Sequence, residues 1–252
     1  MSYLVAENLS IQFGGVRAVN GVSFAVEKGE IFSIIGPNGA GKTSIVNLIS
    51  RFYDPSGGRL LFGDIDITRV APHQIAGLGI GRTFQNIELF EHASVLKNLL
   101  LGRHAHRRTT VFEDLLFLPR ARRQELENRA MVEEVIDFLD LAHHRDTMVA
   151  ALPYGVRKVV ELGRALSLSP TLLLLDEPSS GLNPEETEEL SFWIRDIRDD
   201  LGITVMMVEH DMGLVTAVSD RVLAMNEGAV LAMGSAEAVQ SDPLVVQAYL
   251  GA

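Results

Sequence analysis

The chain has 252 residues, of which 47% are apolar and 22% are charged, as in a globular protein with one large domain or two small ones. It contains no cysteine, which excludes disulfide bonds, thiolate metal sites and a cysteine nucleophile. The formal net charge of −11 argues against nonspecific binding to nucleic acid, which depends on neutralising phosphates. We therefore expect no nucleic-acid partner.

The first part of the chain predicts mainly β-structure followed by one helix. Segments rich in β-formers at Tyr3–Phe13, Ala18–Val26 and Arg59–Phe62 are bounded by glycine-containing turns. The mostly apolar run Glu30–Ile35 predicts a buried strand, and Lys42–Ser50 predicts the helix that follows it.

The middle of the chain, from about Asn86 to Ala151, has a mostly helical pattern and predicts an insert in a sheet-based core. Seven of the 22 basic residues lie between Arg103 and Arg129, either as a solvated helical face or as a docking patch for an acidic partner or lipid headgroups. The longest stretch without Asp, Glu, Lys or Arg is Val70–Gly81, far short of the about 20 residues of a membrane span. We expect neither a transmembrane helix nor a signal peptide.

The last part of the chain returns to alternating strands and helices. Continuous apolar runs at Thr171–Leu175 and Ile203–Val208 are typical of parallel strands that are covered on both faces. Asn183, Pro184 and Glu186 fit the start of a capped helix. The apolar face of this helix is expected to consist of Leu190, Trp193, Ile194, Ile197 and Leu201.

Polar residues or glycine follow each of the three runs that predict buried strands. These residues are Gly36 after the first run, Asp176-Glu177 after the second and Glu209-His210 after the third. Ligands of open α/β sheets bind beyond the carboxyl ends of the strands. The three segments are therefore expected to meet at one site.

The segment from Gly36 to Thr43, GPNGAGKT, matches the phosphate-binding loop G-x-x-x-x-G-K-[ST] in the required strand–loop–helix context. Its glycines let successive N–H groups face an anion, and the following helix adds its positive N-terminal end. Lys42 would reach the outer phosphates of a nucleotide, and the Thr43 hydroxyl would ligate Mg²⁺. The expected nucleotide-binding residues of the loop are Gly36, Pro37, Asn38, Gly39, Ala40, Gly41, Lys42, Thr43 and Ser44.

The pair Asp176-Glu177 at the end of a predicted strand supplies two carboxylates with different tasks. Asp176 could hold Mg²⁺ or its water, and Glu177 could take a proton from an attacking water. A base that acts on water makes the reaction hydrolysis. The alternative is a pair of acidic residues that only opens a loop.

With these motifs in this order, the sequence resembles the ATP-binding-cassette (ABC) ATPases over nearly its whole length. The resemblance implies an α/β fold: a phosphate-loop NTPase core with a mainly parallel sheet, an N-terminal antiparallel β subdomain and a helical insert. In a single domain spanning 1–252, the core would cover about 1–85 and 160–235 and the insert about 86–159. A C-terminal helix would occupy about 236–252. The implied cofactors are ATP and Mg²⁺.

The resemblance also implies functional residues outside the phosphate loop. Gln85 matches the glutamine loop, which links the metal and the attacking water to the helical insert. His210 matches the switch histidine that contacts the γ-phosphate, and Phe13 stands where family members place an aromatic ring against adenine. The alternatives are a surface position for Gln85, a satisfied strand-end histidine for His210 and a core position for Phe13.

Two segments match loops that act across a subunit interface in this family. Ser180, Gly181 and Asn183 match the loop that meets the opposite subunit. The signature position is occupied by Pro153, Tyr154 and Gly155.

The signature departs from the family pattern Leu-Ser-Gly-Gly-Gln at two informative positions. The second is Pro153, which has no hydroxyl and no N–H, and the fifth is Val156 instead of Gln. The hydroxyl that would donate to the γ-phosphate of an ATP bound by the opposite subunit is therefore missing. We expect weak ATPase activity from this chain alone and a heterodimer in the working complex, with a homodimer as the alternative in isolation.

In more detail, the chain resembles the nucleotide-binding subunits of bacterial branched-chain amino acid importers. The resembling segments are Phe13–Asn20, Leu78–Phe90, Ser180–Pro184 and Ala248–Gly251. That subgroup also includes urea and amide importers, so the substrate stays open between them. A nonmembrane cassette acting on DNA or ribosomes, or a small-molecule kinase, is a further alternative, which the single cassette, the acidic charge and His210 disfavour.

The resemblance implies partners and a location. They are integral-membrane permease subunits, a second ATPase subunit and, indirectly, a solute-binding protein, with the chain on the cytoplasmic, inner face of the cell membrane. The groove that receives the permease borders the glutamine loop. Ile87, Leu89 and Phe90 either line this groove or belong to the core.

Overall fold

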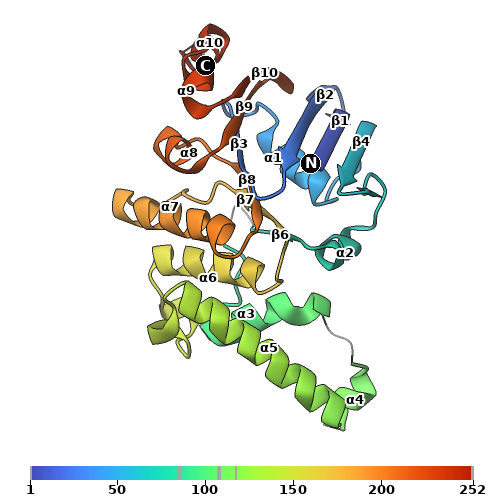
Figure 1. Ribbon diagram of the computed structural model, residues 1–252, viewed down its shortest axis with the longest axis vertical. Coiled ribbons are helices and arrows are strands. Elements are labelled where there is room, and N and C mark those ends of the chain that lie inside the picture. Colours follow the sequence, from blue (N-terminus) through green and yellow to red (C-terminus); the bar gives the residue numbers. More distant parts are fainter. Residues whose placement is uncertain (1, 84–86, 107–108, 117, 251–252) are drawn as a thin grey trace. The chain divides into compact units, whose positions relative to one another are not determined.

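The computed structural model of the chain describes residues 2–83, 87–106, 109–116 and 118–250, coloured along the sequence in Figure 1. It divides into two compact units, the first formed by Met1–Gln85 with Thr171–Ala252 and the second by Asn86–Pro170. The division expected near residue 160 lies inside α6 (Tyr154–Leu166). Because this helix is continuous, the second unit ends at Pro170 instead.

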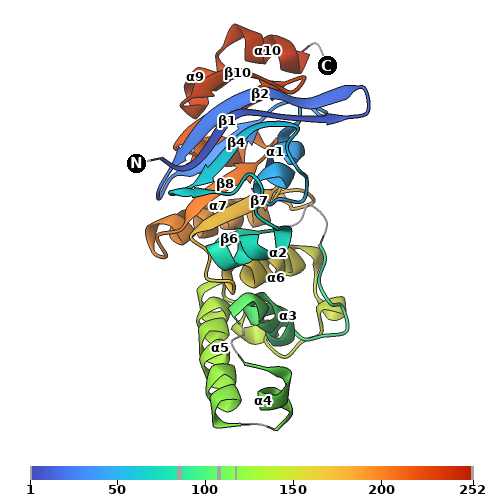
Figure 2. The ribbon, with the colours of Figure 1, turned by 90° about the vertical axis from the view of Figure 1, so that its right-hand side faces the viewer.

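The first unit begins with an antiparallel sheet of strand order β2-β1-β4-β5. Its strands are β1 (Ser2–Phe13), β2 (Val16–Glu27), β4 (Gly57–Phe62) and β5 (Ile65–Asp66), and Figure 2 shows β2, β1 and β4 side by side. Buried apolar residues alternate with more exposed ones along β1, as a sheet with one covered face requires. This is the predicted N-terminal β subdomain.

The second sheet of this unit is mainly parallel and has the strand order β10-β9-β3-β8-β7-β6. Only β10 (Ala229–Gly234) runs antiparallel, against β9 (Arg221–Asn226). The others are β3 (Ile31–Ile35), β6 (Ile80–Arg82), β7 (Leu172–Asp176) and β8 (Thr204–Val208). Every residue of β3, β7 and β8 is buried, which is why these strands read as unbroken apolar runs.

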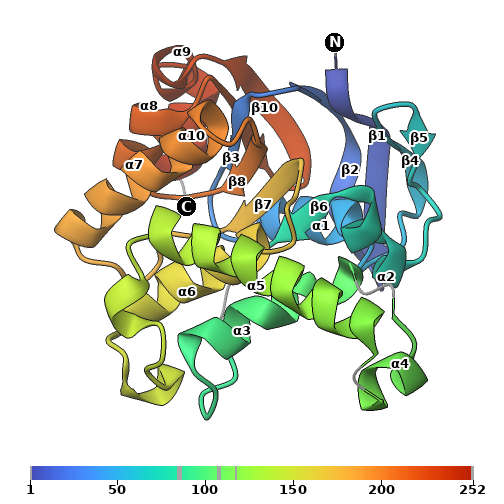
Figure 3. The ribbon, with the colours of Figure 1, turned by 60° about the horizontal axis from the view of Figure 1, so that its bottom comes forward.

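Helices cover both faces of the parallel sheet. Figure 3 shows α7 (Pro184–Asp199) and α8 (Met212–Val218) on one side, with α1 (Lys42–Ile49) and the antiparallel sheet on the other. One hydrophobic cluster joins α1 to both sheets, with Leu4, Ile45 and Leu172 among its fully buried members. Short helices α2 (Pro72–Ile75), α9 (Ala236–Gln240) and α10 (Pro243–Leu250) complete this unit. These layers confirm the predicted α/β fold.

Two sequence expectations about helices were wrong in detail. Leu201 is exposed and lies after the end of α7, because the helix stops at Asp199 and the chain turns at Gly202. The C-terminal region from 236 forms two helices, because the chain turns at Ser241 and Asp242, whose carboxylate accepts a hydrogen bond from the Leu244 amide. By contrast, the capping box predicted at Asn183 and Glu186 is present.

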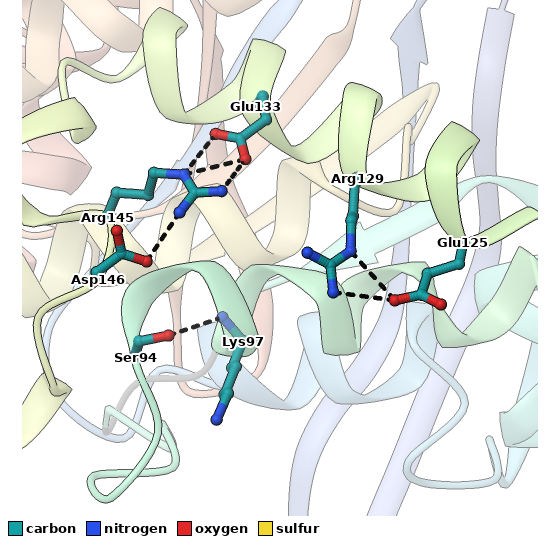
Figure 4. Close-up of polar contacts among 7 residues, drawn as sticks. All are labelled: Ser94, Lys97, Glu125, Arg129, Glu133, Arg145 and Asp146. Carbon is teal, nitrogen blue, oxygen red and sulfur yellow. Dashed lines mark hydrogen bonds and ion pairs between the residues drawn. The ribbon is translucent and has the colours of Figure 1, made fainter. Parts of the chain in front are cut away.

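The second unit is helical and consists mainly of α3 (Val95–Gly102), α4 (Val111–Leu115), α5 (Pro119–Phe138) and α6. Short 3₁₀ turns at Arg103–His106, Ala142–His144 and Val149–Ala151 connect them. Gly102 permits close packing of α3 on α6, since a Cβ there would lie 2.3 Å from the Arg164 carbonyl oxygen. Figure 4 shows Arg145 bound to Glu133 of α5, with Nε 3.0 and 2.9 Å from the two carboxylate oxygens.

Within the described residues, none of the helices is both long enough and apolar enough to cross a membrane.

Candidate active site

The phosphate-binding loop follows β3 directly and leads into α1 (Figure 1). Two of its glycines are required by close backbone contacts. A Cβ on Gly36 would lie 2.2 Å from the Met225 carbonyl oxygen, and one on Gly41 would lie 2.1 Å from the Ala18 carbonyl oxygen. Gly41 also has a left-handed φ of 99°. The loop can therefore curl as an anion site requires only with glycine at these positions.

Lys42 lies folded across this loop. Its Nζ donates hydrogen bonds to the carbonyl oxygens of Gly36 at 2.7 Å and Pro37 at 3.1 Å, and the residue is only 5% exposed. Burial lowers the pKa of the ammonium group, while the nearby carboxylates of Glu177 and Asp176 raise it. A cation held at the mouth of a loop rich in N–H groups is suited to the outer phosphates of a nucleotide.

Asp176 ends β7 and is buried beside the start of α1. Burial raises the pKa of its carboxyl, and the ion pair with Arg82 lowers it, as does a hydrogen bond from the Thr43 hydroxyl. Its Oδ1 is buried and accepts no hydrogen bond among the described residues. A buried oxygen that lacks a donor, next to a threonine hydroxyl, fits a Mg²⁺ ion or its water.

Arg82, whose role the sequence did not reveal, joins Asp176 to α1. Its Nη2 lies 3.1 Å from Asp176 Oδ2, and its Nη1 donates to Asn47 Oδ1 at 2.7 Å and Ser50 Oγ at 2.8 Å. The only signal in the sequence was an arginine three residues before Gln85. Gln85 itself lies outside the described residues.

Glu177 directly follows Asp176 and adopts a left-handed backbone with φ of 50°, which is uncommon for a residue other than glycine. Its amide donates to the Val208 carbonyl at 2.9 Å, and its carbonyl accepts from the Ser180 amide at 3.1 Å. These bonds fix the turn that carries Glu177. Strained backbone of this kind is common in active sites.

Glu209 is fully buried and organises the loop that carries His210. Its carboxylate accepts hydrogen bonds from the amides of Ser179 at 2.8 Å, His210 at 2.8 Å and Asp211 at 3.1 Å. The histidine ring lies outside this anchor, 56% exposed, with Nδ1 3.8 Å from Glu209 Oε2. His210 thus has a fixed backbone and an accessible ring. The sequence suggested a role for His210 and none for Glu209 beside it.

The loop between β7 and α7 carries Ser180, Gly181 and Asn183. Gly181 is exposed and has a left-handed φ of 81°. The Asn183 side chain accepts a hydrogen bond from the Glu186 amide at 2.9 Å, which makes it the N-cap of α7. The loop leaves the sheet beside Glu177, and the Asn183 cap fixes its other end at the start of α7.

Phe13 lies at the end of β1 and is 44% exposed. Its ring meets the Tyr53 ring edge-on, with 5.0 Å between the ring centroids. The structure therefore does not support the alternative that Phe13 is a core residue, and a planar ligand could reach its ring.

The signature segment belongs to the helical unit, where Pro153 is the N-cap residue of α6 and provides no side-chain cap. Tyr154 is 47% exposed. Arg157 steadies the turn by donating to the carbonyls of Leu152 at 2.9 Å and Ala150 at 2.8 Å. Because Pro153 cannot bond them, the first N–H groups of α6 depend on other acceptors.

Phe90 in the same unit has a fixed backbone and an exposed ring. Asn98 is buried and bonds both the amide of Phe90 at 2.8 Å and its carbonyl at 3.1 Å. Phe90 is 61% exposed, whereas Ile87 and Leu89 are half-buried. An anchored aromatic ring facing water suits a contact surface.

In the part of the chain that the structure describes, no group of three or more His, Cys, Asp or Glu side chains could hold a metal ion by itself. A Mg²⁺ ion at Thr43 and Asp176 would need further oxygen ligands, which nucleotide phosphates and water supply.

Comparison with known proteins agrees with this geometry. The ABC transporter family model matches residues 19–180, and a model described as branched-chain amino acid ATP-binding cassette transporter matches residues 229–252. The chain is 39% identical to the high-affinity branched-chain amino acid transport ATP-binding proteins BraF of Pseudomonas aeruginosa and LivG of Escherichia coli, over 98% of this chain and 97% of each relative. A solved ATP-binding cassette of an ABC transporter, in its ADP conformation, matches with a TM-score of 0.87 and 32% identity over the whole of both chains.

Proposed function

This chain belongs to the ATP-binding cassette family of ABC transporters, and we propose that it is the ATP-hydrolysing subunit of an importer of branched-chain amino acids. The observation that carries the hydrolytic role is the meeting of Lys42, Asp176 and Glu177 at the ends of β3 and β7. The choice of substrate is supported by the C-terminal match over residues 229–252 and by the names of the relatives.

Nucleotide binding would use the loop from Gly36 to Ser44. Its backbone N–H groups and the N-terminus of α1 would surround the phosphates, and Lys42 would exchange its carbonyl partners for phosphate oxygens. Phe13 would stack on adenine. Thr43 and Asp176, with Gln85, would hold Mg²⁺, which when bound neutralises charge on the phosphates.

Hydrolysis would use Glu177 as the base. Its carboxylate would accept a proton from water as the water oxygen attacks the γ-phosphorus and the bond to the ADP oxygen breaks. His210, fixed through Glu209, would donate to the γ-phosphate. Cycles of ATP binding and hydrolysis would close and open a dimer of ATPase subunits.

The dimer would be asymmetric. Each ATP would lie between one subunit's phosphate loop and the other's signature segment together with Ser180, Gly181 and Asn183. Pro153 leaves the second signature position without the serine hydroxyl, so a second, related ATPase subunit with a serine there would give one complete site. The transporter would also contain integral-membrane permease subunits and receive its substrate from a solute-binding protein. The chain would thus sit on the cytoplasmic face of the membrane.

Reconstitution tests this proposal. The chain would be assembled with its permease, second ATPase subunit and solute-binding protein in liposomes, and ATPase activity would be measured with leucine, isoleucine, valine, urea and short-chain amides. We expect stimulation by the three amino acids and no stimulation with Glu177→Gln. Stimulation only by urea or an amide would overturn the substrate assignment, and a fully active Glu177→Gln complex would overturn the role of Glu177.

A further inference from the structure

Arg82 stands out because it binds three polar groups from two elements that meet only in the folded protein. It ends β6, and its side chain is 14% exposed. One arm of the guanidinium contacts Asp176 Oδ2 at 3.1 Å, and the other contacts Asn47 Oδ1 at 2.7 Å and Ser50 Oγ at 2.8 Å. The planar fork of arginine can bridge groups in this way, whereas lysine cannot.

Two partners of Arg82, Asn47 and Ser50, form one polar stripe with Thr43. Thr43 and Asn47 lie four residues apart on α1, and Ser50, the C-cap residue of this helix, follows three residues later, which places the three on one face. They are half-buried, whereas Ile45, Val46, Leu48 and Ile49 between them are fully buried. Thr43 lies next to Asp176 at one end of the stripe, and Arg82 binds Asp176 together with Asn47 and Ser50. Arg82 therefore fixes the distance between α1 and Asp176.

Asp176 needs such a partner because its carboxylate is completely buried. A buried charge without a counter-charge is strongly unfavourable. Arg82 supplies the counter-charge at Oδ2, while Oδ1 accepts no hydrogen bond among the described residues. One oxygen of the carboxylate is thus held and the other is available.

We propose that Arg82 is a positioning residue for Mg²⁺: it holds Asp176 against α1 so that Oδ1 and the Thr43 hydroxyl present a preformed site to the metal or its water. This rests on the proposed function, since it assumes that the phosphate loop binds a nucleotide. Groups that orient a metal-binding side chain commonly account for about 10–100-fold in metal affinity. Binding of the nucleotide without metal depends on Lys42 and the loop amides, which Arg82 does not contact in any described hydrogen bond.

The test measures binding and needs no turnover. The purified full chain would be titrated with a fluorescent ATP analogue, first in EDTA and then at fixed nucleotide with increasing Mg²⁺. For Arg82→Gln we expect unchanged affinity in EDTA and a Mg²⁺ midpoint raised about tenfold or more. Asn47→Ala, which removes one tether and leaves the ion pair, should raise the midpoint less. Arg82→Lys should fall between Arg82→Gln and the natural chain.

Arg59→Gln is the matched control, because Arg59 makes an exposed ion pair with Asp66 at 2.8 Å in the antiparallel sheet. It should leave both titrations unchanged. A Mg²⁺ midpoint in Arg82→Gln equal to that of the control would overturn the inference, and so would weaker binding in EDTA with no change in midpoint. If Arg82→Gln does not fold, an unshifted midpoint in folded Asn47→Ala would overturn it. If the natural chain does not bind the analogue in EDTA or with Mg²⁺, the proposed function fails instead.

Discussion

Replacing Pro153 by serine should restore a missing donor and a missing helix cap together. Pro153 already has the extended backbone of an N-cap residue, with φ of −56° and ψ of 157°, and its carbonyl accepts the Arg157 amide at 3.1 Å. A serine can therefore enter without moving the backbone. Its Oγ would accept an N–H of Gly155 or Val156 in the first turn of α6.

The stability that the serine cap is expected to add can be separated from the effect of losing proline. A serine N-cap stabilises a protein by about 1 kcal/mol relative to alanine. Loss of proline frees the unfolded chain and costs about 0.4–1 kcal/mol, so Pro153→Ser alone should change stability little. The informative comparison is with Pro153→Ala, which loses the ring and gains no oxygen. Urea unfolding should show Pro153→Ser about 1 kcal/mol more stable than Pro153→Ala. Equal stability would refute the reasoning about the cap.

The same pair of variants tests the signature. A hydrogen bond to a charged phosphate contributes about 1.5–3 kcal/mol, which corresponds to a tenfold to hundredfold change in rate or affinity. The ATPase activity of the isolated chain should rise within that range for Pro153→Ser and stay low for Pro153→Ala. If the two variants hydrolyse ATP equally, or if the unaltered chain is already fast and unaffected by a partner ATPase subunit, the missing hydroxyl does not limit this chain.

Three further substitutions examine other parts of the site. Lys42→Ala removes the cation beside the phosphates and should weaken nucleotide binding or turnover at least tenfold in the assembled complex; unchanged affinity and turnover would exclude that role. Glu177→Gln should keep ATP bound through gel filtration with the partner present while hydrolysis falls at least a hundredfold, and a normal rate would show that another group is the base. Phe90→Glu places a charge on the exposed ring position and should uncouple ATPase activity from transport while the thermal unfolding temperature stays unchanged; a folded variant with normal transport would contradict a permease contact.

The sequence predicted the fold correctly and located the candidate phosphate loop because the signals for both are local. The buried strands β3, β7 and β8 are continuous apolar runs, and the phosphate loop is a contiguous motif whose glycines at 36 and 41 meet specific backbone oxygens. The start of α7 was predicted from Asn183 and Glu186, which are three residues apart and bind each other.

The residues that the sequence missed act through contacts between distant parts of the chain. Arg82 and Asp176 are 94 residues apart, and Glu209 binds the amide of Ser179, 30 residues away. No spacing rule connects such pairs, because the sheet order that places β6 beside β7, and β7 beside β8, is set by the whole core. The misplaced end of α7 at Leu201 has a similar cause: the apolar spacing continues past the residue where the chain turns back toward β8.

Uptake of radiolabelled leucine by liposomes that contain the complete transporter is the most direct measurement. ATP and Mg²⁺ would be supplied on the side of this chain, and the solute-binding protein on the other. We expect leucine to accumulate with ATP, and to stop accumulating when this chain carries Glu177→Gln. Accumulation that is equal with and without ATP, or that persists unchanged with Glu177→Gln, would contradict ATP hydrolysis at this site as the source of energy for import.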